Sequence, residues 1–178
     1  MVTTNTDLYA TDFVAWCQDT AALVRTGQWE AIDTEALAEE LDTLGRSEKR
    51  ALESDLEVLL IHLIKWQQLP TYREESHSWF DTIVEHRSRI ARLLRDNPSL
   101  RPQVAALVQD VYPTARTRAL GAIVPSQFPA LRGPGGRGKA SRWPTDTGLL
   151  REMIRRSPFP TTCPWTADEV LHPDFWPE

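Results

Sequence analysis

The chain has 178 residues, of which 41% are hydrophobic and 25% are charged, and its formal net charge is −5. This composition is typical of one globular domain, and the negative charge argues against binding nucleic acid through the whole surface. No apolar run approaches the roughly 20 residues of a membrane span, and the N-terminus lacks the pattern of a signal peptide. We therefore expect a cytoplasmic protein whose two cysteines, Cys17 and Cys163, are reduced thiols.

Charge is distributed unevenly along the chain. Residues 33–57 contain nine acidic and three basic side chains, a net charge of −6, whereas residues 131–156 contain seven basic and two acidic side chains, a net charge of +5. The basic segment suits an anionic partner or the acidic helices of the protein itself.

Apolar residues recur at helical spacing through most of the first 124 positions, and this periodicity predicts helices. The first is expected from about Thr11 to Gly27, because glycine favours the left-handed conformation that ends a helix. A short second helix follows Asp33 and is expected to end at Gly45. Ser47 is a plausible cap for a third helix that reaches residue 68.

Two more helices are predicted over residues 78–97 and 99–124, and Pro113 is expected to kink or break the second of them. The Pro/Gly-rich basic segment 125–147 has no apolar period and is predicted to be a loop. After a short helix, the tail carries a capping box at Thr166 and Glu169, and its aromatic residues are expected to dock on the bundle. These aromatic residues are Phe159, Trp165, Phe175 and Trp176.

The predicted fold class is therefore all-α, with a single domain over residues 1–178 and about five to six helices. Residues 1–124 would form the helical bundle, residues 125–147 the loop, and residues 148–178 the short helices and the docked aromatic tail.

Several short motifs occur in a fixed order along nearly the whole chain. They are LYATDFVAW (8–16), LAEELDTLGRSEKRAL (37–52), LIHLIKW (60–66), SW (78–79), PSLR (98–101) and the closing FPTTCPWT and DFWPE. Together they resemble the DUF29 family of bacterial proteins. The resemblance implies an all-α bundle and supplies neither a reaction nor catalytic residues. The glycine-rich loop and Pro113 depart from the family pattern.

Three ionisable residues, His62, His86 and Glu40, share helical faces with apolar residues and are expected to point inwards. We favour a buried polar network, since buried polar groups usually satisfy one another. A general acid/base pair and a metal site are the alternatives. Lys65 is a weaker catalytic candidate, and we expect its ammonium group in water or beside Asp55 or Glu57.

The basic loop offers a possible contact with nucleic acid or a partner through charge and one stacking ring. The residues concerned are Arg132, Arg137, Lys139, Arg142 and Trp143. Residues 133–139 match the spacing of a phosphate-binding loop, but Ala140 replaces the final hydroxyl and no strand is predicted before them.

The sequence favours a non-enzymatic interaction or adaptor protein that binds another protein or itself, and it predicts no cofactor. The alternatives are a nucleic-acid-associated module that uses the basic loop, and a metal-dependent enzyme built on His62, His86 and Glu40.

Overall fold

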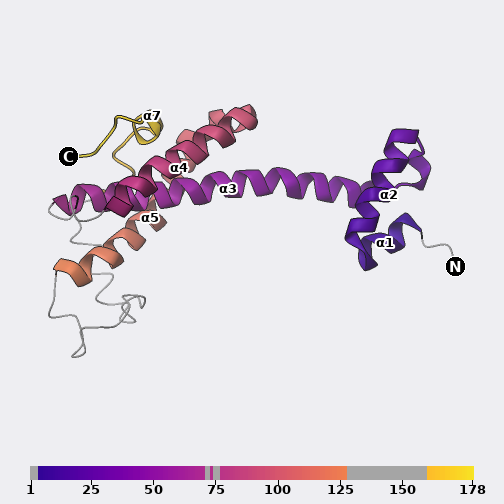
Figure 1. The fold of residues 1–178 in the computed structure, drawn as a ribbon, viewed down its shortest axis with the longest axis horizontal. Helices are drawn as coiled ribbons and strands as arrows, with labels where there is room; N and C mark the ends of the chain where they lie inside the picture. Colours follow the sequence, from indigo (N-terminus) through magenta and orange to yellow (C-terminus); the bar gives the residue numbers. More distant parts are fainter. Residues whose placement is uncertain (1–3, 71–72, 74–76, 128–159) are drawn as a thin grey trace, which may run out of the picture. The chain divides into compact units, whose positions relative to one another are not determined.

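The computed structural model describes residues 4–70, 73, 77–127 and 160–178, and these residues contain helices and no strand (Figure 1). The predicted all-α class is confirmed. The elements are α1 (Asn5–Thr11), α2 (Phe13–Thr26), η1 (Trp29–Ala31), α3 (Thr34–Gln68), α4 (His77–Asp96), η3 (Pro98–Gln103), α5 (Val104–Gln127) and α7 (Ala167–Leu171). No helix in the described ranges is long and apolar enough to cross a membrane.

The chain divides into two compact units, and the division falls within α3. The first unit, Met1–Lys49, comprises α1, α2, η1 and the start of α3. The second unit, Arg50–Glu178, comprises the rest of α3 and all later elements.

The helices of the first unit begin and end at residues that satisfy their terminal backbone groups. Thr4 and Asp7 form a capping box that starts α1, a helix that the apolar pattern did not predict. The Asp12 side chain accepts a hydrogen bond from the backbone N–H of Ala15 and starts α2. As predicted, Gly27 ends α2 in the left-handed conformation, with φ of 71°.

The core of the first unit is small and partly polar. Asn5 is buried, and its Nδ2 donates to Asp19 and to Thr20 at 2.9 Å, while its Oδ1 accepts from the backbone N–H of Asp33 at 3.3 Å. This one side chain therefore joins α1, α2 and the start of α3. The buried apolar residues of this unit are few: Trp16, Ile32 and Ala36.

The predicted break between two helices at Gly45 and Ser47 is wrong, because α3 continues through both residues. Gly27 is the only described residue with positive φ, so Gly45 does not adopt a terminating conformation. A glycine inside a helix costs about 1 kcal/mol relative to alanine, and the strong helix formers around it outweigh that cost.

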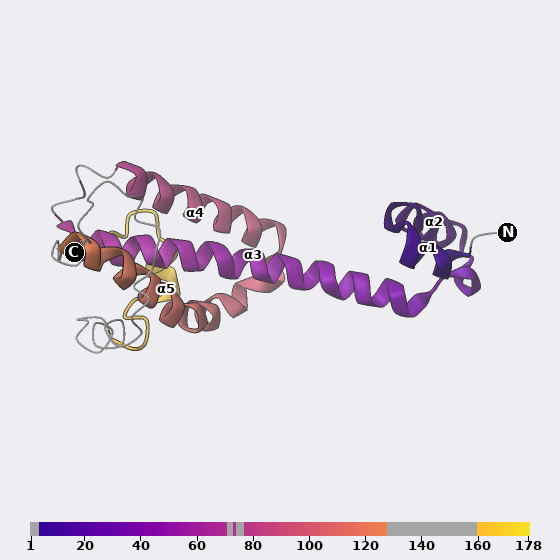
Figure 2. The same cartoon turned by 90° about the horizontal axis from the view of Figure 1, so that it is seen from below.

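In the second unit, α4 and α5 lie alongside the C-terminal half of α3 (Figures 1 and 2). Their facing side chains form the main core, in which Leu59, Leu63 and Ile83 are completely buried. A kink or a break was expected at Pro113, and the structure excludes the break, since α5 runs through this residue. Pro113 has no N–H to donate to the carbonyl of Gln109, and both residues are exposed.

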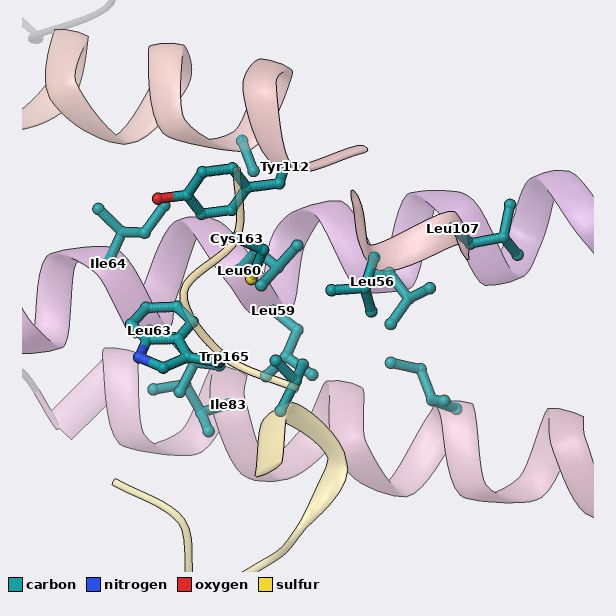
Figure 3. Close-up of a cluster of buried hydrophobic side chains, with 14 of the residues drawn as sticks. Leu56, Leu59, Leu60, Leu63, Ile64, Ile83, Leu107, Tyr112, Cys163 and Trp165 are labelled. Carbon is teal, nitrogen blue, oxygen red and sulfur yellow. The ribbon is translucent and has the colours of Figure 1, made fainter. Parts of the chain in front are cut away.

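The C-terminal tail docks on this core as predicted for Trp165, Phe175 and Trp176, whereas Phe159 lies outside the described residues. Trp165, Cys163 and Val170 are buried in it, and Phe175 and Trp176 pack against it. Figure 3 shows Trp165 beside Leu63 and Ile83. The predicted capping box at Thr166 and Glu169 is present and starts α7.

Candidate functional site

Among the predicted inward-facing residues, His86 lies next to a buried carboxylate. Its Nδ1 is 2.9 Å from Oδ1 of Asp55, whose side chain is 6% exposed. Arg89 Nη2 lies 3.2 Å from the same oxygen. An ionised carboxylate only accepts hydrogen bonds, so Nδ1 of His86 is the donor in this contact. Asp55 thus links α3 to α4 through two donors.

His62 lies on the same face of α3 as Asp55. Its Nδ1 donates to the backbone carbonyl of Val58, 2.8 Å away and one turn earlier. Burial lowers the pKa of His62, and the nearby Lys65 and His86 lower it further, so this imidazole stays neutral near pH 7. A neutral, internally bonded histidine fits a structural role in the helix.

The ammonium group of Lys65 was expected in water or beside Asp55 or Glu57, and the structure shows no ion pair between Lys65 and either of these two acids. The ammonium group lies over the ring of Trp79, 5.9 Å from the ring centroid, and burial lowers its pKa. Glu57 instead contacts Arg118 at 2.6 Å. Lys65 is therefore held by an aromatic face rather than by an acid.

The third predicted residue, Glu40, lies in the first unit, and both histidines lie in the second. Its Oε1 accepts a hydrogen bond from the hydroxyl of Tyr9 at 2.9 Å, and this bond is the main reason why the pKa of Tyr9 is raised. Within the part of the chain that the structure describes, no three histidine, cysteine or acidic side chains come together as a metal site requires.

The predicted contact residues of the basic loop, Arg132, Arg137, Lys139, Arg142 and Trp143, lie outside the described residues, as does the predicted helix over 148–156.

A groove that the sequence analysis did not predict lies between α2 and the start of α3. Its volume is about 420 Å³. The α2 wall is formed by Phe13, Trp16, Cys17, Thr20, Ala21, Val24 and Arg25. The α3 wall is formed by Leu37, Glu40, Leu41 and Leu44. Both sets recur at steps of three and four, which places each on one helical face.

The apolar walls of this groove are open to solvent. Leu41 and Leu44 are 60% and 64% exposed, and Phe13 is 49% exposed. Trp16 also lines the groove but is only 2% exposed. The centroid of its ring lies 5.5 Å from that of Phe13 and 4.9 Å from that of Tyr9. Six of the eight large exposed hydrophobic residues of the described chain belong to the first unit: Phe13, Val14, Val24, Trp29, Leu41 and Leu44.

The sequence contained both halves of this groove, because apolar residues recur at helical spacing in residues 13–24 and in residues 37–44. Periodicity shows that a helix has an apolar face, but it does not show whether another element covers that face. The groove was therefore not predicted, although both helical faces that form it are apolar in the sequence.

Comparison with known proteins identifies the family of the chain. No curated protein and no solved structure matches it. The family model described as domain of unknown function DUF29 matches residues 8–132, a range that includes the groove, both histidines and Asp55. The chain therefore belongs to the DUF29 family, as its motifs indicated.

Proposed function

We propose that this chain is a non-enzymatic protein-interaction protein and that the groove between α2 and α3 binds a helix of its partner. The observation that carries the proposal is the exposure of Phe13, Leu41 and Leu44 along one groove in a small unit. Contiguous exposed apolar surface on a folded protein is typical of an interaction site.

A helix suits the groove better than a small molecule does. The volume of about 420 Å³ falls within the range of small-molecule pockets. However, Leu41 and Leu44 in its wall are 60% and 64% exposed, and open apolar surface of this kind is typical of protein-interaction sites. An amphipathic helix places apolar residues at steps of three, four and seven, and these match the spacing of the groove walls.

The polar residues of the second unit support an interaction protein rather than an enzyme. His86 and Arg89 both contact Oδ1 of Asp55 and so join α4 to α3. Nδ1 of His62 is used by the carbonyl of Val58 within its own helix. These groups satisfy one another, which is what a folded scaffold needs.

Site-specific photocrosslinking tests the proposal. A photoreactive amino acid at Leu41 would lie in the groove, whereas one at Asp42 would lie on the same helix, outside the groove lining. In cells that express the protein, position 41 should crosslink to a discrete partner, and the additional substitution Leu44→Ser should abolish this product. Position 42 should not yield the product. The proposal fails if position 41 yields no adduct, or if both positions yield the same one.

A further inference from the structure

We propose that the occupant of the groove is a basic amphipathic helix of a different protein. This inference rests on the proposed function and adds the chemistry of the partner. It is carried by the charge of the unit that contains the groove and by a carboxylate held in the groove wall.

The first unit is strongly acidic. Residues 1–49 contain ten acidic and three basic side chains, a net charge of −7, whereas the whole chain has a net charge of −5. The remaining residues are therefore slightly basic, and the negative charge is concentrated in the unit that contains the groove. A surface of one sign attracts a partner of the opposite sign and speeds its association.

One carboxylate is fixed where it would meet a bound helix. Glu40 lines the groove between Leu37 and Leu41 in sequence, and the hydroxyl of Tyr9 holds its Oε1 at 2.9 Å. A positioned carboxylate at the edge of an apolar groove favours a lysine or arginine that flanks the apolar stripe of the partner. Arg25 is the one basic residue among those that line the groove, and it should oppose such a partner.

A second copy of this chain is a poorer occupant. Two first units would each bring a net charge of −7 to one interface, and like charges brought together at an interface cost binding free energy. The charge that would repel a second copy would attract a basic helix.

Binding of two designed peptides to the full-length protein tests the inference. Both peptides are 18-residue helices with the same leucine stripe, and the flanking residues are lysine in one and glutamate in the other. Affinity is measured by fluorescence anisotropy at low and at physiological salt. The lysine peptide should bind at least about tenfold more tightly, which is about 1.4 kcal/mol, and the preference should shrink as salt screens the charges.

Matched variants locate the effect. Glu40→Gln should weaken binding of the lysine peptide by about two- to fivefold, the usual range for one exposed charge pair, and Arg25→Gln should strengthen it. Asp42→Asn removes the same charge outside the groove lining and should change affinity less than Glu40→Gln does. If Asp42→Asn weakens binding as much, the cation is not placed beside Glu40 and the inference is overturned.

The remaining outcomes separate the inference from the proposed function. If both peptides bind equally and Leu44→Ser abolishes both, the groove binds helices without charge preference, and only the inference fails. If neither peptide binds, the helix-binding groove itself is refuted. If the protein alone sediments as a dimer that Leu44→Ser dissociates, the occupant is a second copy and the inference is overturned.

Discussion

Asp55 and His86 join α3 to α4 through a contact of 2.9 Å between a buried carboxylate oxygen and an imidazole nitrogen. Arg89 donates to the same oxygen, so one acceptor serves two donors. The Asp55→Asn substitution removes the charge and leaves a poorer acceptor for both. We expect it to lower the free energy of unfolding by about 1–3 kcal/mol, measured by urea denaturation.

The control for Asp55 is an exposed acid on the same helix. Asp42 lies 4.0 Å from Arg46, and both side chains are more than half exposed. Exposed pairs of this kind contribute little, so Asp42→Asn should leave stability nearly unchanged. Equal effects of the two substitutions would show that the buried contact adds nothing beyond an ordinary surface charge.

Arg87 holds the C-terminal tail on the second unit. Its guanidinium group donates to the backbone carbonyls of Val170, Pro173 and Phe175 at 3.0, 3.1 and 2.6 Å. Arg87→Met should release these three acceptors and lower the free energy of unfolding by about 2–4 kcal/mol. Thermal melting and limited proteolysis of the tail measure this effect.

Arg92→Met is the matched control, because Arg92 is an exposed arginine on the same helix. Its melting temperature and its pattern of proteolysis should match those of the wild type. If Arg87→Met behaves in the same way, the tail is held by its aromatic contacts alone, such as that of Trp176 with Phe80.

The stability of the second unit should depend on the protonation of His62. Burial lowers the pKa of His62 in the folded state, so the unfolded chain takes up a proton at a higher pH than the folded protein does. With respect to His62, the folded state is therefore most stable above pH 6.5, which is about the pKa of a histidine in the unfolded chain. Stability is lost as pH falls below that value.

His62→Gln should flatten the curve of unfolding free energy against pH between pH 7 and 5, because His62 takes up its proton in the unfolded chain within this range. If the curve of His62→Gln has the same shape as that of the wild type, burial of His62 does not govern the acid response.

Tyr112 combines complete burial with a hydroxyl group that forms no hydrogen bond to any described residue. Figure 3 shows its ring projecting from α5 into the core. Because a buried unpaired hydroxyl is unfavourable, Tyr112→Phe should keep or raise stability at neutral pH, by up to about 1 kcal/mol.

The same substitution should alter the alkaline response. Burial raises the pKa of Tyr112 to about 12, from an ordinary value of 10.0. The unfolded chain therefore loses this proton first, and stability falls as pH rises from about 10 towards 12, by at most about 2–3 kcal/mol. Tyr112→Phe should remove this part of the decline in alkaline urea titrations. An unchanged decline would show that the hydroxyl group is not buried in solution.

Much of the fold could be predicted from periodicity and capping residues, because these signals are local. Gly27 ends α2 and the box at Thr166 starts α7 as the sequence indicated. The expected end of a helix at Gly45 was wrong, and Pro113 does not break α5, because a single helix breaker is tolerated inside a helix that other interactions stabilise.

The contacts between helices were less predictable. Which carboxylate reaches His86 depends on the register of α3 against α4, and sequence spacing does not determine that register. The sequence suggested Asp55 as a neighbour of Lys65, and the structure pairs it with His86. The groove was missed for a related reason, because the apolar face of a helix has the same sequence pattern whether another element covers it or solvent reaches it.

Occupancy of the groove by a partner is measured most directly through the thiol of Cys17. Cys17 lines the groove and is exposed, whereas Cys163 is buried, so a thiol reagent reports on the groove alone. The rate of Cys17 modification is measured in an extract of cells that express the protein and is divided by the rate for the same protein after purification. We predict that this normalised rate is several-fold lower for the wild type than for Leu44→Ser. Equal normalised rates would contradict the proposal that the groove is a binding site.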